Sequence, residues 1–237
     1  MEKTLYRSEN RGKADHGWLK ARHSFSFAGW HNPQRLHFGV LRVLNDDIVA
    51  PGRGFDMHPH ENMEIITIPL SGYLEHRDDM GNTSMIQEGD VQVMSAGTGV
   101  LHSEYNPDDE QAVNLLQIWL FPRERNLTPR YQQKTFYPEK QVNQLVQIIS
   151  PDQDDGLMWL HQDAWFYISL VEAGNKLEHH FHHDHNGVYL FLISGELEVA
   201  GEKLRARDAI GVSRTDKLTI QGLKDSRFLL MEFPMQN

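Results

Sequence analysis

The sequence contains no cysteine, no long apolar run and no excess of basic residues, and each absence excludes a class of protein. Without cysteine there is neither a disulfide framework nor a thiolate metal site. No run reaches the roughly 18 apolar residues that a membrane helix needs. Asp and Glu outnumber Lys and Arg by 33 to 23, for a net charge of −10, whereas phosphate binding demands a concentrated basic face. We therefore expect a cytoplasmic protein that binds neither nucleic acid nor membrane directly.

What the sequence does contain is a series of short β-rich runs. Hydrophobic residues make up 39% of the 237 positions and charged residues 24%, as is typical of globular proteins with room for one large or two ordinary domains. Helical periodicity is scarce, and glycine-marked turns separate runs of strand length, among them 64–70, 91–94, 115–121, 188–193, 196–199, 209–213 and 228–233. Strands at such spacing predict a sandwich or barrel.

The chain also shows an internal repeat. The stretch 122–138 carries three prolines and many polar side chains, and we interpret it as a connector. On each side of it a glycine stands six positions before an His-x-His pair, Gly52 before His58 and Gly174 before His180. Two diverged copies of one β unit would explain this match.

Two pairs of metal-liganding side chains stand at spacing i, i+2, namely His58 with His60 and His102 with Glu104. In an extended strand alternate side chains share a face, so the members of each pair would lie side by side. On neighbouring strands of a closed sheet, the two pairs would aim three imidazoles and one carboxylate at one point. That donor set suits a divalent transition metal and leaves coordination positions open.

The spacing Gly52-(x)5-His58-x-His60-(x)3-Glu64-(x)7-Gly72 resembles the first motif of the cupin superfamily, and 89–99 with His102 resembles the second. Finer features resemble the pirin family, closely from Arg7 to about Arg130 and more weakly beyond. They are Gly17-Trp18-Leu19, His23-Ser24-Phe25-Ser26-Phe27, Leu41-Arg42-Val43-Leu44-Asn45-Asp46-Asp47, His58-Pro59-His60-Glu61-Asn62-Met63-Glu64 and the run from Met94 to Glu104.

The resemblance implies an all-β bicupin fold, with two jelly-roll-type barrels and few short helices. It implies an N-terminal metal-binding cupin domain over 1–130 and a degenerate C-terminal cupin domain over 131–237. It also implies one divalent transition metal, Fe(II) first and Zn, Cu, Ni, Mn or Co as alternatives, since such sites accept several ions. The ligands that match are His58, His60, His102 and Glu104.

The choice of carboxylate is open on sequence, because many cupins use the glutamate of the first motif, here Glu64. We favour Glu104, because its spacing gives it the same strand face as His102. Glu64 would then orient an imidazole from outside the ligand set. Either Glu104 or Glu64 is a candidate catalytic base.

Some pirins resemble quercetin 2,3-dioxygenases, so we expect a metal-dependent dioxygenase that opens the ring of a flavonol such as quercetin. A bound metal would lower the pKa of the flavonol hydroxyl. The alternative is a non-enzymatic pirin that senses metal or redox state and binds a regulatory protein partner. A sugar-phosphate isomerase is disfavoured, because no Lys or Arg for a phosphate cradle lies between Gly54 and Arg77. Sequence leaves the native metal, the substrate and the oligomeric state open.

The remaining histidines carry weaker signals. Within the cluster His179–His185, His180 and His182 occupy the first-motif register, but Asn186 replaces the glutamate and no later histidine follows. We interpret the cluster as a solvated loop, and leave open whether it binds metal. His23, His31, His37 and His76 lack partners at ligand spacing and are expected at the surface or hydrogen-bonded in the core.

Several aromatic residues could line a pocket for an aromatic substrate, namely Trp18, Phe25, Phe27 and Trp119. Phe55 and Met57 alternate with the histidines. We therefore expect both on the opposite face of the strand, away from the pocket.

Overall fold

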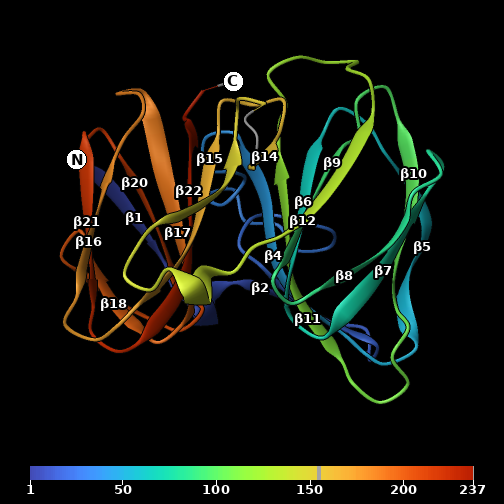
Figure 1. Ribbon diagram of the computed structural model, residues 1–237, viewed down its shortest axis with the longest axis horizontal. Helices are drawn as coiled ribbons and strands as arrows, with labels where there is room; N and C mark the ends of the chain where they lie inside the picture. The colour runs from blue at the N-terminus through green and yellow to red at the C-terminus, as the bar shows by residue number, and fades with distance from the viewer. Residues whose placement is uncertain (154–155, 237) are drawn as a thin grey trace.

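The regular secondary structure is almost entirely β-strand, arranged as two barrels side by side (Figure 1). The computed structural model describes residues 1–153 and 156–236. Over those residues the only helices are two short 3₁₀ helices, η1 (Ser8–Asn10) and η2 (Pro138–Lys140). None of the described helices is long and apolar enough to span a membrane. The predicted all-β fold of two barrels is confirmed.

The first barrel closes a seven-stranded sheet against a four-stranded one. In spatial order, the larger sheet contains β12 (Arg130–Thr135), β9 (Asp90–Ser95), β6 (Glu64–Ser71), β11 (Val113–Leu120), β4 (Leu41–Val49), β3 (Leu19–His23) and β2 (Gly12–Asp15). The smaller sheet contains β5 (Arg53–His60), β10 (Val100–Asn106), β7 (Tyr73–Asp78) and β8 (Thr83–Gln87).

The second barrel repeats this plan. Its larger sheet contains, in order, β1 (Glu2–Tyr6), β20 (Ala209–Ser213), β17 (Asn186–Ser194), β22 (Ser226–Pro234), β15 (Trp165–Val171), β13 (Val146–Ser150) and β14 (Met158–Trp159). Its smaller sheet contains β16 (Lys176–His180), β21 (Lys217–Gly222), β18 (Glu196–Val199) and β19 (Glu202–Arg205). The repeat inferred from glycine spacing is therefore visible as one strand order used twice.

The two barrels exchange their edge strands. β1 precedes the first barrel in the chain but pairs with β20 in the second. β12 lies in the stretch 122–138 that we had interpreted as a connector, and it pairs with β9 of the first barrel. Position by position, β12 completes the first large sheet as β1 completes the second. A domain boundary at residue 130 stays a prediction. The structure adds that β1 pairs within the second barrel and β12 within the first.

The main hydrophobic core lies between the barrels and draws on both of them. It joins fully buried side chains of the first barrel, such as Ile66 and Ile118, to Phe166 and Met231 of the second. The interiors of the two barrels differ. Among the described residues, sixteen buried apolar side chains fill the second barrel, whereas the two apolar clusters inside the first are small. The interior of the first barrel is thus left for polar side chains.

Candidate metal centre

Three histidines converge inside the first barrel. On the antiparallel ladder of β5 and β10, His102 stands opposite His58 and Val100 opposite His60, so all three imidazoles share the inner face. The ring centroids of His102 and His58 are 4.4 Å apart, and His60 lies 4.9 Å from each. One ring nitrogen from each residue lies within 4.8 Å of the other two. A single cation between them can contact all three.

The carboxylate of Glu104 is buried next to this group. Thr67 donates a hydrogen bond to its Oε1 at 3.1 Å, and Gln117 donates from Nε2 to its Oε2 at 2.8 Å. Glu104 forms a second cluster of potential ligands with His102 and His76, again within 4.8 Å. His102 is therefore common to both clusters. Glu104 lies close to His102, but it is grouped with His76 rather than with His58 and His60, so its place in the ligand set stays a prediction.

The ring nitrogens of these histidines are suited to a metal. Both ring nitrogens of His102 are buried, and in the described parts of the chain neither has a hydrogen-bond partner. Nδ1 of His58 donates to the carbonyl oxygen of Asp56 at 2.7 Å, which leaves Nε2 with a free lone pair. An uncompensated buried donor or acceptor is costly, and coordination would remove that cost at the ring nitrogen of His102 that binds the ion.

Burial favours the neutral forms of His60 and His102, as metal binding requires. Burial, with the neighbouring His102 and His58, lowers the pKa of His60 from 6.5 to about 4. Burial, with His58 and His76, lowers the pKa of His102 to about 3. Three neutral imidazoles and one carboxylate would leave a divalent ion with a net charge of +1, which favours a further anionic ligand.

A β-bulge in β5 changes which side chains reach the site. The register passes from His102 opposite His58 to Glu104 opposite Phe55, so β5 has one extra residue between these pairs. The extra residue reverses the alternation, and Phe55 turns to the inner face. Our expectation that Phe55 points away was therefore wrong, whereas Met57 is 53% exposed as expected. Gly54 permits the close approach, because a Cβ there would collide with the backbone of Glu104.

A cavity of about 210 Å³ opens over the three histidines. Phe27, Phe55 and Trp119 are among its lining residues, together with the polar groups of His23, Asn45 and Asp47. Trp18 packs edge-on against Phe55 from behind, at 5.2 Å between ring centroids, and Phe25 lies in the core between the barrels. The lining combines aromatic faces with a few polar groups, as pockets for small aromatic ligands do.

Asp47 is the unusual group in this lining. It is 5% exposed, and its Oδ1 has no hydrogen-bond partner in the parts of the chain described. Burial, together with the nearby Asp46 and Glu104, raises its pKa from 3.8 to about 8. A protonated carboxyl at neutral pH would present a donor to a ligand in the cavity.

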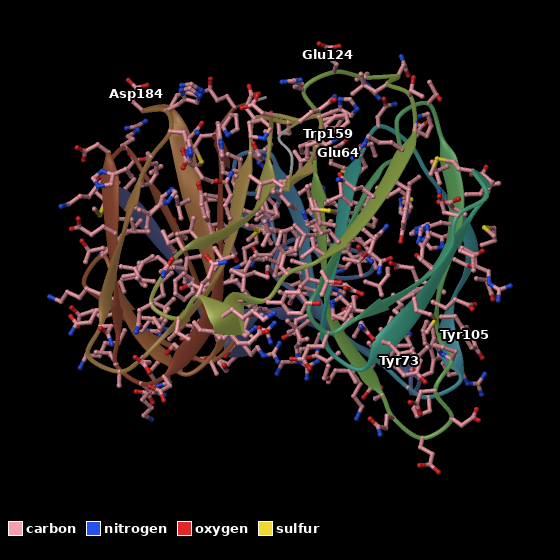
Figure 2. All side chains as sticks on the ribbon, in the orientation of Figure 1. Glu64, Tyr73, Tyr105, Glu124, Trp159 and Asp184 are labelled. Carbon is pink, nitrogen blue, oxygen red and sulfur yellow. The ribbon has the colours of Figure 1, made fainter. Side chains whose placement is uncertain are left out.

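Glu64 does not join the histidines. It lies at the start of β6, on the side of the sheet that faces the second barrel (Figure 2). Its Oε2 accepts hydrogen bonds from the hydroxyl of Ser95 at 2.8 Å and from the backbone N–H of His161 at 3.1 Å. Within 1–153 and 156–236 no imidazole nitrogen bonds to it, so the geometry does not support the predicted role of orienting a ligand. Burial raises its pKa.

His76 is completely buried and hydrogen-bonded, as expected for a core histidine, but its position beside His102 was not predicted. It stands opposite Glu104 across the β10–β7 ladder, and its Nε2 donates to Oδ2 of Asp78 at 3.1 Å. The spacing His76-x-Asp78 has the same i, i+2 signature as the other pairs and was the available signal. His23, which donates from Nδ1 to Asn45 Oδ1 at 3.0 Å, was also missed as a pocket residue. His31 and His37 are exposed, as expected.

The histidine cluster of the second barrel differs from its prediction. His180, assigned to the motif register, is exposed, whereas its neighbour His179 is buried. His179 stands opposite Leu218 as His58 stands opposite His102, so the structural counterpart of His58 is His179. The one-residue offset equals the extra residue of the bulge in β5. His179, His182 and Glu232 bring their ligand atoms within 4.8 Å of one another.

Comparison with known proteins gives consistent results along the chain. Residues 5–120 match the Pirin family model, and residues 147–233 match that of the quercetinase C-terminal cupin domain. The chain is 39% identical over 230 residues to quercetin 2,3-dioxygenase of Escherichia coli (strain K12), covering 97% of this chain and 98% of that protein. A pirin-like protein of Caulobacter vibrioides is 39% identical over 222 residues, covering 93% and 95%.

Solved structures agree. The bacterial pirin YhhW from Escherichia coli, in complex with nickel(II), superposes with a TM-score of 0.93 at 37% identity, over 98% of this chain and 99% of that one. A quercetin 2,3-dioxygenase from Acinetobacter baumannii shares the fold, with a TM-score of 0.72 at 18% identity, over 98% and 78%.

Proposed function

The chain belongs to the pirin family, and we propose that it is a metal-dependent dioxygenase that opens the ring of a flavonol such as quercetin. The observation that carries the proposal is the convergence of His58, His60 and His102 on one point at the floor of an aromatic-lined cavity. The E. coli relative named quercetin 2,3-dioxygenase, similar along nearly the whole chain, supports it.

We propose His58, His60, His102 and Glu104 as the metal ligands. The three histidines supply nitrogen lone pairs, and burial lowers the pKa of His60 and of His102. Glu104 supplies negative charge from a carboxylate held by Thr67 and Gln117. The nickel(II) complex of a relative supports a divalent ion. Fe(II) is our first choice for dioxygen chemistry, although the donor set also suits Ni, Zn, Cu, Mn and Co.

A divalent metal at this position would act as a Lewis acid, which lowers the pKa of a flavonol hydroxyl and holds the flavonol and dioxygen together. The chain itself binds and orients the substrate. Phe27, Phe55 and Trp119 offer faces and edges to its rings, and Asp47 is a donor for one of its oxygens. We propose Glu104 as the acceptor of the hydroxyl proton, since Glu64 lies on the other side of the sheet.

The test is an assay of the Fe(II)-loaded protein with quercetin, run in air and under anaerobic conditions. We expect loss of flavonol absorbance only with oxygen, and its disappearance in His102→Ala. His31→Ala, at an exposed position, is the matched control and should retain the activity. An iron-loaded, folded wild-type protein that leaves quercetin unchanged in air would contradict the proposal. Capture of a partner protein that depends on the redox state of the metal, without turnover, would favour a regulatory pirin instead.

A further inference from the structure

A second group of metal-liganding side chains lies inside the second barrel, far in the chain from the site described above. Nε2 of His179 is 2.7 Å from Oε2 of Glu232, and Nδ1 of His182 is 2.8 Å from the same oxygen. The ligand atoms of all three residues lie within 4.8 Å of one another. Two imidazoles thus converge on one carboxylate oxygen.

Local structure explains how these three residues meet. Burial alternates along β16, which turns His179 inward and leaves Glu178 and His180 exposed. The strand ends at His180, and beyond it the ring of His182 stacks on Trp165, with centroids 4.1 Å apart and planes 6° from parallel. Glu232 stands on β22 between β15 and β17 and is completely buried. Tertiary structure therefore holds each side chain in place.

The carboxylate of Glu232 is oriented by donors on its other oxygen. Oε1 accepts hydrogen bonds from the backbone N–H of His182 and from Nδ2 of Asn186, each at 2.7 Å. Oε1 is thereby occupied, and Oε2 is left to face the two imidazoles. The remaining amide oxygen of Asn186 is buried without a hydrogen-bond partner in the described residues. Outer donors that fix a ligand in this way are characteristic of metal sites.

We propose that His179, His182 and Glu232 form a second site for a divalent transition-metal ion. Two imidazoles and one carboxylate are a donor set for such ions, with positions left open for water or a small anion. Without an ion, His179 and His182 would each have to donate a ring N–H to Oε2 of Glu232. A cation bound at this point takes the place of both protons. The side chain of His182 is 33% exposed, which gives the ion a route of entry from solvent.

This site is not a copy of the one in the first barrel. Opposite His179, β21 carries Leu218, and the next inward residue is Ile220, where β10 carries His102 and Glu104. The carboxylate comes instead from β22. With three protein ligands rather than four, the second site binds its ion more weakly, and it loads after the first.

Metal titration of the full-length protein tests this proposal. The tag is removed, metals are stripped with a chelator, and Zn²⁺ binding is followed by calorimetry and elemental analysis. The background is His58→Ala/His102→Ala, which disables the first barrel. We expect that protein to bind one equivalent of Zn²⁺, and its Co²⁺ form to show the visible absorption of an imidazole-bound ion.

Adding Glu232→Gln or, separately, His182→Ala should remove this binding or weaken it at least ~10- to 100-fold. His180→Ala is the matched control, because its side chain is exposed on the same strand, and it should leave the affinity unchanged. Circular dichroism establishes that each variant is folded, and His182→Ala at the barrel mouth serves if Glu232→Gln is not. Binding that survives His182→Ala, or that is lost in His180→Ala, overturns the proposal, as does no binding in the background protein.

Discussion

Gln117 donates a hydrogen bond from Nε2 to Oε2 of Glu104 at 2.8 Å, inside a barrel where both side chains are almost completely buried. Thr67 donates to the other carboxylate oxygen. The orientation of Glu104 is therefore set by two neighbouring strands rather than by solvent.

Replacing Gln117 with Ala should weaken metal binding by ~10- to 100-fold, the usual effect of losing a group that orients a ligand. Calorimetric titration with Ni²⁺ measures the change. Asn114→Ala is the control, since it removes a half-buried amide from the same strand that contacts Asp46 rather than Glu104. If Gln117→Ala and wild type bind Ni²⁺ with equal affinity, the hydrogen bond from Gln117 to Glu104 does not contribute to metal binding.

The bulge in β5 leads to a prediction about the pocket. Phe55 faces the cavity and Met57, two residues away, faces solvent. Phe55→Ala should raise the KM or Kd for a flavonol about tenfold, equivalent to ~1.4 kcal/mol of lost aromatic contact. Metal content should not change, and Met57→Ala should behave as wild type. A Phe55→Ala protein with unaltered flavonol affinity would show that the substrate lies elsewhere.

Asp47 should destabilise the metal-free protein as pH rises. Its folded pKa is raised from 3.8 to about 8, so between these values the unfolded chain releases a proton that the folded protein retains. Stability contributed by the protonated group is thus lost as pH rises toward 8. Asp47→Asn should raise the free energy of unfolding at pH 8, because the neutral amide avoids the loss of up to ~1.4 kcal/mol per pH unit that the carboxyl suffers above its unfolded pKa. Urea unfolding at pH 4 and pH 8 tests this, with little difference expected at pH 4.

His60 and His102 should have the opposite effect on stability, which they lower as pH falls. Burial lowers their folded pKa values from 6.5 to about 4 and about 3, so below pH 6.5 the unfolded chain takes up protons that the fold excludes. Their contribution is complete above pH 6.5 and declines as pH falls, by at most ~1.4 kcal/mol per pH unit for each histidine. In metal-free His60→Gln or His102→Gln, the loss of urea resistance between pH 6.5 and pH 4 should be smaller than in wild type. His31→Gln should reproduce the wild-type profile.

The core shared by the barrels should make them unfold together. Ile118→Ala removes a completely buried side chain from that core and should cost ~2–5 kcal/mol. Ile48→Ala, at a 44% exposed position on the neighbouring strand β4, is the matched control and should cost far less. Tryptophan fluorescence and circular dichroism should report one coincident transition in urea. Two separated transitions would show that the barrels are independent.

Much of the site could be predicted, because period-2 alternation holds wherever a strand is regular. The pair His58 and His60 on β5 and the pair His102 and Glu104 on β10 both follow this alternation, and the two strands pair with each other. The bulge could not be predicted from alternation, because an extra residue has no signature in a pattern of apolar and polar side chains. It reversed the expectation for Phe55, and it shifted the comparison of His58 with the second half by one position.

Contacts that depend on long-range pairing were equally inaccessible. Glu232 reaches His179 only because β22 lies in the middle of its sheet, some fifty residues later in the chain. Nothing in the run around Glu232 distinguishes it from a buried strand that carries one polar residue. Local sequence patterns were enough to predict the fold class. The pairing partner of each strand could be identified only from the three-dimensional structure of the closed barrel.

The exchange of edge strands has a consequence for how the polypeptide is made. β1 can dock only after β20 has left the ribosome, and at roughly 5–20 residues per second that delay is on the order of 10–40 s. Until then β1 remains an unpaired segment N-terminal to the first barrel, whereas β12 can already pair with β9 and cover the edge of that barrel's large sheet. A bulky fusion N-terminal to β1 would therefore interfere with the assembly of the second barrel, which emerges last, rather than with that of the first barrel, which follows it directly in sequence.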